Sequence, residues 1–445
     1  MDEIGDGFHT PDTKRGEQAL LPLIMGTGLL LRVYTIRRIL LIVAIVMVAT
    51  GCDTGNDGGN ARINGSTIDI PAIEWLKQNL IDGNVEPRLV NGLLPDGFYQ
   101  PLLAHDWTPK PQQKATLISQ ARFIYVMAMG YEITGNKRFL AAMQHAADYL
   151  LNHFSDPDIP GQWYRALQAD GHVGNRGFHA YGNAQVIFAL AHAYKITQDA
   201  KYLDAAMSTW LELDISGAIA DTNKHYDLHG LNAAMHIFES LIALYKASDR
   251  SKLIGTDVNA LAKYIVGHFY DPKLGVFVEE LTPKLERKPD GEIRLGHAIE
   301  IAFLLSRAVD AGLPASYLEP ANASVDFVAR QAAKHPEGLI PHTTDYQGNP
   351  RDPTEYWWSQ TELLRGLAHF SLHRGRNDLN SQFNKTFMGV RKHFIDPHDS
   401  GWYKTADGIT LDKGEPWKAG YHVTMMLTEL MRLKGMQFLS GNEVL

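Results

Sequence analysis

A break between apolar stretches recurs along this chain at nearly equal intervals. Three breaks share His-Phe, then Asp-Pro, then a glycine and an aromatic residue: "NHFSDPDIPGQWY" (152–164), "GHFYDPKLGVFVEE" (267–280) and "KHFIDPHDSGWYKT" (392–405). Counted between positions 97, 153, 211, 268, 335 and 393, the intervals are 56, 58, 57, 67 and 58 residues. Six breaks at near-equal intervals indicate six copies of one supersecondary unit.

Each unit is predicted to be a helical hairpin. Stretches such as "TLISQARFIYVMAMGYEITG" (116–135) carry apolar residues at helical spacing, and strand-like alternation is scarce. One period has room for two helices of about fifteen residues and a loop. An open solenoid would show the same period, but open arrays need polar caps, and neither end resembles one. We therefore expect an all-α fold, an (α/α)6 barrel with inner and outer helix rings.

The N-terminal region resembles a bacterial lipoprotein signal. Arg37 and Arg38 precede "ILLIVAIVMVATGC", which ends in Cys52, the only cysteine. An uncleaved membrane anchor is the alternative, but a span needs about twenty apolar residues and this run is shorter. We expect an N-terminal extension and signal peptide over 1–52, a flexible tether over 53–69, and the barrel domain over 70–445. Lipid attached to Cys52 would anchor the protein on the periplasmic side of the cell envelope.

Composition and the absence of certain motifs exclude several kinds of partner and site. The net charge is −8 and no Lys/Arg block interrupts the region after Cys52, so nucleic acid is not an expected partner. A single cysteine excludes an internal disulfide and a cysteine metal site. His-Glu-x-x-His and a Gly-rich phosphate loop are both missing from the sequence, so we expect no metal and no cofactor.

Polar residues interrupt several apolar helical stretches. "NAAMHIFESL" (232–241) places His236 and Glu239 on one helical face, and "GHAIEIAFLL" (296–305) does the same with His297 and Glu300. A lone histidine in an apolar helix is most often a core residue, yet a buried glutamate needs a partner. With His422 in "YHVTMMLTELMRL" (421–433), these residues are expected near helix N-termini at one barrel mouth. Two facing imidazoles can take and return a proton near neutral pH.

Five motifs in order resemble the acylglucosamine 2-epimerase family, which includes cellobiose 2-epimerases and mannose isomerases. They are "QARFIYVMAMGYEITGNKRFLAAM", "NAAMHIFESLIALY", "GHAIEIAFLL", "EYWWSQTELLRG" and "PWKAGYHVTMML". The resemblance runs from about residue 70 to 435 and implies the same (α/α)6 barrel. The "WWSQTE" form is nearest to the cellobiose epimerases. Ala234 and Val423 depart from the family pattern, which leaves the identity of the sugar open.

The resemblance also implies roles for individual residues. His297 and His422 match the general acid and base, and His236 matches a third histidine that assists ring opening. Supporting roles fall to Glu239, Glu300 and Arg122, and substrate contacts to Tyr181, Asn232, Trp358 and Trp417. For Trp357 a core position is expected.

The expected function is a sugar 2-epimerase or aldose–ketose isomerase that acts through an enediolate on a small-molecule sugar. Two alternatives stay open. A glycoside hydrolase or lyase on the same barrel would need a pair of carboxylates, which Glu239, Glu300 and Glu362 could supply. A sugar-binding lipoprotein without catalysis would bind the sugar but not turn it over.

Overall fold

The structure is a computed structural model that describes residues 67–221, 228–409 and 412–441. The expected signal peptide, Cys52 and the tether up to residue 66 lie outside the described residues, so the expectations about them stay predictions. Contacts divide the chain into two units, and the description below concerns the unit Ile63–Leu445. Among its described residues, no helix is both long and apolar enough to span a membrane.

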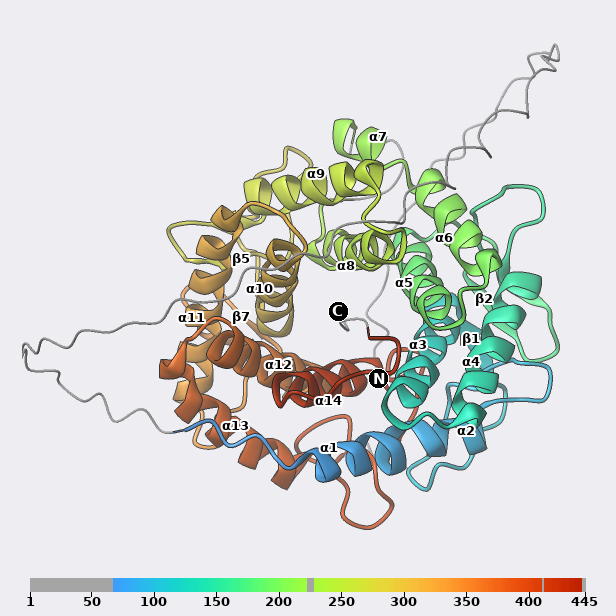
Figure 1. Ribbon diagram of the computed structural model, residues 1–445. Coiled ribbons are helices and arrows are strands. Elements are labelled where there is room, and N and C mark those ends of the chain that lie inside the picture. The colour runs from blue at the N-terminus through green and yellow to red at the C-terminus, as the bar shows by residue number, and fades with distance from the viewer. Residues whose placement is uncertain (1–66, 222–227, 410–411, 442–445) are drawn as a thin grey trace, which may run out of the picture. The chain divides into compact units, whose positions relative to one another are not determined.

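Six helices form an inner ring. They are α3 (Leu117–Thr134), α5 (Ala180–Thr197), α8 (Leu231–Ala247), α10 (Leu295–Asp310), α12 (Trp357–His373) and α14 (Tyr421–Leu433). Each packs against the next, and α14 packs against α3, so the ring is closed (Figure 1). Closure confirms the predicted (α/α)6 barrel and excludes the open solenoid.

The outer ring alternates with the inner one along the chain. It consists of α1 (Ile73–Leu80), η1 (Ile81–Val85) and α2 (Glu86–Gly92) as one run, α4 (Lys137–Tyr149) with η2 (Leu150–Phe154), α6 (Ala200–Leu213), α9 (Lys252–His268), α11 (Leu318–Lys334) and α13 (Asn380–His393). Short helices α7 (Ile215–Ala220), η3 (Ala315–Tyr317) and η4 (Asn377–Leu379) lie between them. The breaks seen in the sequence coincide with the ends of these outer helices.

Burial explains which helices lie inside. In α3, 16 of the 18 residues are buried, as expected for a helix that is apolar all round. The outer α13 buries one stripe that includes Phe383, Phe387 and Val390, at helical spacing. Helix α3 begins with a reciprocal capping box between Thr116 and Ser119, which satisfies backbone groups at its N-terminus.

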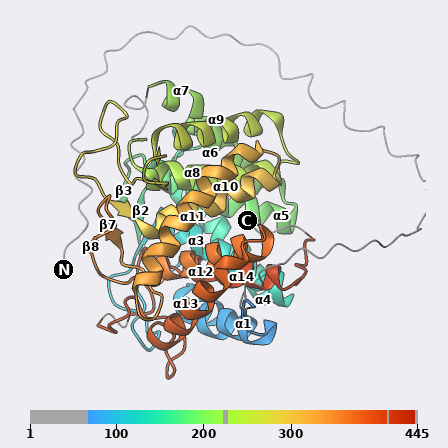
Figure 2. The same ribbon diagram turned by 90° about the vertical axis from the view of Figure 1, so that its left-hand side faces the viewer.

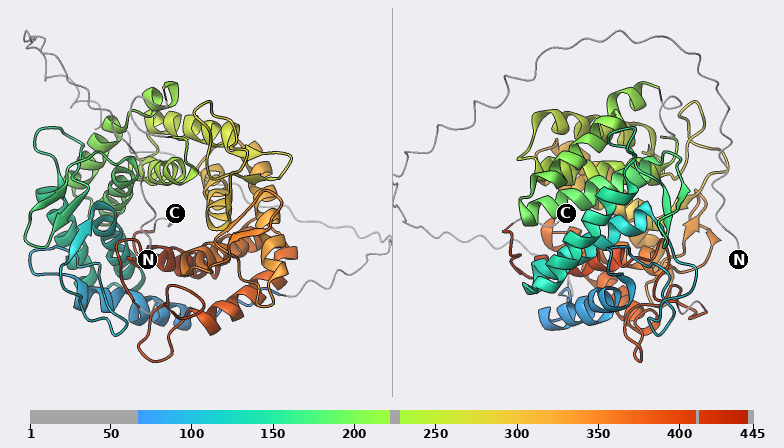
Figure 3. Two further views of the ribbon diagram at one scale, coloured as in Figure 1. Left: turned by 180° about the vertical axis from the view of Figure 1, so that it is seen from behind. Right: turned by 90° about the vertical axis from the view of Figure 1, so that its right-hand side faces the viewer.

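Short antiparallel strands gather at one end of the barrel (Figure 2). They pair as β1 (Lys114–Thr116) with β2 (Ala166–Gln168) and β3 (Val173–Asn175), β4 (Tyr270–Asp271) with β5 (Val276–Phe277), and β6 (Ile293–Arg294) with β7 (Thr343–Thr344) and β8 (Pro350–Asp352). The further views in Figure 3 show the same two rings. Because β1 leads into α3 and β6 into α10, this end carries the N-termini of the inner helices.

Candidate active site

Three buried histidines enter the barrel from the N-terminal halves of inner helices. His297 is the third residue of α10 and His422 is the second residue of α14, so both lie at the end where the strands gather. His236 is the sixth residue of α8 and lies about one turn deeper. The structure therefore brings together the three histidines that the sequence singled out.

Each of these histidines has its Nδ1 atom beside a glutamate. The pairs are His236 with Glu239 (3.1 Å), His297 with Glu279 (2.9 and 3.1 Å) and His422 with Glu362 (2.8 Å). Within the described part of the chain, no hydrogen bond occupies the Nε2 atom of any of the three. A histidine oriented through Nδ1 and open at Nε2 is suited to exchange a proton with a ligand.

The two His-x-x-Glu stretches do not behave alike. The first forms a pair within α8, but His297 contacts Glu279 and not Glu300. His297 lies in the first turn of α10, and helical side chains lean towards the N-terminus, so its ring meets the loop after β5. Glu300 lies one turn further into the barrel, where its Oε1 is 3.6 Å from the guanidinium of Arg365. The shared spacing predicted the same helix face for each pair, but not a shared partner.

Glu279 and Glu362 hold protons differently. Burial acts to raise the pKa of Glu279, but the charges of His297 and Arg294 outweigh burial and lower it. Burial raises the pKa of Glu362 to about 7, although Arg365 opposes the rise. Near neutral pH the Glu279 carboxylate is therefore ionised, whereas Glu362 is partly protonated.

A cluster of buried charge lies deeper in the barrel. Burial and the neighbouring Glu362 raise the pKa of Glu300 well above its ordinary value, which favours the protonated acid. The Tyr421 hydroxyl donates to Glu239, and Arg365 is wholly buried between Glu300 and Glu362. Two groups of three side chains have possible metal-ligand atoms within 4.8 Å of one another. One group is Glu300, Glu362 and His422, and the other is His236, Glu239 and Glu300. Arg365 already supplies a positive charge to these carboxylates.

The Trp358 ring lies beside both His297 and His422 at the mouth. Its ring centroid lies 5.0 Å from that of His297 and 5.7 Å from that of His422. A Cβ atom at Gly296 would lie 2.4 Å from Cζ3 of Trp358, so only glycine leaves room for this indole. The glycine of the "GHAIE" motif thus positions an aromatic wall between the two imidazoles.

Arg122 and two aromatic residues form another side of the mouth. The guanidinium donates to the Tyr181 hydroxyl (2.5 Å) and to the backbone carbonyl of Trp417 (3.4 Å). Tyr181 stacks on His236 at 4.6 Å and on Trp417 at 6.1 Å. Trp417 is 49% exposed, which is unusual for an indole and typical of a surface that receives a ligand.

The other two predicted residues lie at the mouth and in the core. Asn232 is half-buried in the first turn of α8, at the same mouth, and Trp357 is buried in the core as expected. Sequence reasoning assigned no role to Glu279 or Arg365. Arg365 follows Glu362 by three residues in the apolar α12, so its burial could have been predicted from the sequence. Glu279 lies in a loop and had none.

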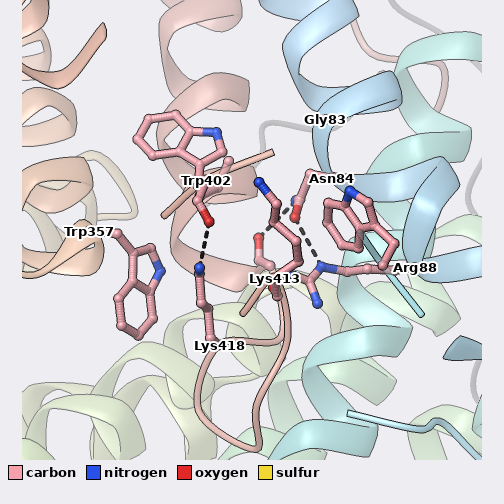
Figure 4. A pocket seen from close by; sticks show the side chains of 10 residues that line it. Gly83, Asn84, Arg88, Trp357, Trp402, Lys413 and Lys418 are labelled. Carbon is pink, nitrogen blue, oxygen red and sulfur yellow. Dashed lines mark hydrogen bonds between the residues drawn. The ribbon is translucent and has the colours of Figure 1, made fainter. Parts of the chain in front are cut away.

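A small cavity is lined by residues of η1, α2, α14 and the loop that carries Trp417, among them Asn84 and Lys418 (Figure 4). The Lys418 ammonium donates to the carbonyls of Trp402 (2.5 Å) and Asp412 (2.8 Å). The Asn84 amide donates to the carbonyl of Gly420 (3.0 Å), whose φ of +84° and contact with Asn84 both require glycine. These hydrogen bonds hold the backbone segment that leads into His422.

Comparison with known proteins supplies the relatives of this chain. The family model described as N-acylglucosamine 2-epimerase (GlcNAc 2-epimerase) matches residues 97–425. A cellobiose 2-epimerase from Ruminococcus albus is 24% identical over 373 residues, which cover 75% of this chain and 92% of that protein. Among solved structures, cellobiose 2-epimerase from Bacillus thermoamylovorans has a TM-score of 0.73 at 17% identity, covering 82% of this chain and 99% of that one. A D-mannose isomerase has a TM-score of 0.72 at 20% identity, covering 81% and 97%.

Proposed function

Because the chain belongs to the N-acylglucosamine 2-epimerase family, we propose that it interconverts reducing sugars by proton transfer at C1 and C2. It is a carbohydrate epimerase or isomerase. The observation that carries the proposed chemistry is the pair His297 and His422. Both imidazoles are paired with a glutamate through Nδ1, leave Nε2 unoccupied among the described residues, and contact the same indole, Trp358.

The proposed reaction starts from the open-chain aldose. His297 removes the proton from C2, and the electrons pass to the carbonyl oxygen, so that an enediolate forms. The ionised Glu279 suits His297 to this task, because an adjacent carboxylate stabilises the imidazolium that results. Arg122, which is bonded to Tyr181 and to the backbone of Trp417 at the same mouth, would supply the positive charge that stabilises the enediolate oxygens.

His422 then returns a proton. Burial lowers the pKa of His422 well below its ordinary value, and its partner Glu362 has a pKa of about 7. This pair can hold the proton on the carboxyl and pass it on through the imidazole. Delivery to the opposite face of C2 yields the epimer, and delivery to C1 yields the ketose.

His236 is assigned the opening of the sugar ring. Its Nδ1 bond to Glu239 orients the imidazole, and Tyr181 covers one ring face at 4.6 Å. The exposed Trp417 offers a surface on which a sugar ring can stack. We propose a monosaccharide or a β-linked disaccharide as the substrate, in line with the names of the relatives.

A hydrolase needs one carboxylic acid and one free carboxylate on either side of the bond. In this site Glu239 pairs with His236 and Tyr421, and Glu362 pairs with His422 and Arg365. Engaged carboxylates of this kind favour proton transfer by histidine over glycoside hydrolysis.

The test is incubation of the protein with a panel of aldoses and β-linked disaccharides in D₂O, followed by NMR. We expect deuterium at C2 of at least one sugar, together with its epimer or ketose. Release of new reducing ends without deuterium at C2 would establish a hydrolase instead. Binding of a sugar without any exchange or product would establish a binding protein.

A further inference from the structure

We propose that Glu279 is the positioning residue of the reaction, which holds His297 in the orientation and tautomer of a proton acceptor. This inference rests on the proposed function. It assigns to a loop residue the supporting role that the family resemblance implied for Glu300.

The backbone of Glu279 is fixed before its side chain is considered. Its N–H donates to the carbonyl of Glu292 (3.1 Å), and its carbonyl accepts from the N–H of Leu231 (2.9 Å), the first residue of α8. Glu279 therefore joins the segment ahead of α10 to the start of α8. The backbone from which the side chain extends is thus held by the first residue of α8 and by the segment before β6.

Both carboxylate oxygens of Glu279 lie close to one nitrogen of His297. Oε2 is 2.9 Å and Oε1 is 3.1 Å from Nδ1, and the carboxylate is buried. Arg294 approaches Oε1 from another direction at 3.5 Å. The carboxylate thus lies between an imidazole and a guanidinium, which restricts it to one orientation.

This geometry determines where His297 carries its proton. An ionised carboxylate can only accept hydrogen bonds, so Nδ1 must be the protonated nitrogen. The lone pair is then on Nε2, the nitrogen without a hydrogen bond in the described part of the chain. When Nε2 takes a proton from the sugar, the imidazolium is stabilised by a negative charge at contact distance.

The other charged and titratable groups around His297 do not replace Glu279. Arg294, His342 and His236 can add only positive charge near the Glu279–His297 pair, so none of them can take the place of a carboxylate. Burial lowers the pKa of His342 to about 4, so that ring is neutral near pH 7. Glu300 lies one turn further along α10, where its Oε1 is 3.6 Å from the guanidinium of Arg365.

The test is the variant Glu279→Gln, measured over pH with the sugar that shows exchange at C2. Glutamine keeps the size of the side chain but removes the charge. We expect kcat to fall by about 100-fold or more with little change in KM, as when the carboxylate partner of a catalytic histidine is neutralised. The acid limb of the kcat/KM profile should move to lower pH, because the imidazolium loses its counter-charge.

The matched control is Glu280→Gln, one residue further along the chain. Glu280 is exposed and pairs with Lys288 at the surface. We expect the control to keep the wild-type kcat and pH profile. A Glu279→Gln variant with the rates and profile of this control would overturn the inference.

A second measurement applies even if Glu279→Gln does not fold. Selective ¹⁵N labelling of histidine in the wild-type protein reports which ring nitrogen of His297 is protonated, with His297→Ala to assign the signal. We expect the Nδ1–H tautomer, and the Nε2–H tautomer would overturn the proposal. Absence of any C2 exchange in the wild type would overturn the proposed function instead, so the two failures are distinguishable.

Discussion

Two histidine–glutamate pairs connect the same two helices, α12 and α14, at opposite ends of the barrel. At the mouth, His422 of α14 lies 2.8 Å from Glu362 of α12. At the other end, His369 of α12 lies 2.8 Å from Glu429 of α14. The bond lengths are equal and all four residues are buried, so neither burial nor pairing distinguishes a reactive pair from a structural one.

The difference lies in what surrounds each pair. The second nitrogen of His369 is bonded to the Ser306 hydroxyl at 2.7 Å, and Arg432 makes two 2.7 Å contacts with Glu429. That network uses the donors and acceptors of both partners. His422 has no such bond at Nε2 among the described residues, and its partner Glu362 has a raised pKa. His422 therefore has a ring nitrogen available to a ligand, whereas both ring nitrogens of His369 are already engaged by protein groups.

Matched substitutions should separate the two pairs most strongly in activity. His422→Asn can still donate to Glu362 through its amide but cannot titrate, so we expect turnover to fall by about 1,000-fold. His369→Asn is the control and should keep wild-type turnover. The measurement is the C2 exchange rate in D₂O for both folded variants. Equal rates in the two variants would contradict the distinction drawn here.

The opposite effect is expected for stability. His369→Ala removes the bonds to Glu429 and Ser306 and leaves a cavity, so we expect the free energy of unfolding to fall by about 3 kcal/mol. Urea unfolding measures this loss, and the exchange rate of the folded variant should stay close to wild type. A variant that is as stable as the wild type but inactive would reverse the assignment of the two ends.

The smallest expected effect is on the pH dependence of stability. Burial lowers the pKa of His369 from 6.5 to about 4, so the unfolded chain binds more protons than the folded one between these values. Stability should therefore be complete above about pH 6.5 and should decline as the pH falls towards 4, by up to about 1.4 kcal/mol per pH unit from this residue.

His369→Ala should flatten that slope. Urea unfolding of both proteins at about pH 7 and about pH 5 provides the comparison. A residual slope is expected in the variant, because burial also lowers the pKa of His342 to about 4. The same slope in the wild type and the variant would show that His369 makes no contribution.

Much of this architecture could be predicted from the sequence. The recurrence of breaks identified six hairpins, because each outer helix ends in a similar loop. His236, His297 and His422 interrupt apolar helical stretches, so their location on inner helices could be predicted from the sequence. Pairing was harder to predict. Glu279 follows the short strand β5 in one of the recurring loops, and its contact with His297 depends on where α10 begins relative to that loop.

By itself, the sequence determined the number of helical units, the helices that would be buried, and the residues that would face the interior. These properties depend on local spacing and on the free energy of burying apolar surface, which the order of residues records. Only the tertiary structure decided that the ring closes, that His297 contacts Glu279 rather than Glu300, and that the histidine pair at one end is open while the other is enclosed. Hydrogen-bond partners are chosen by distances of a few tenths of an ångström between residues far apart in the chain, and no local pattern contains those distances.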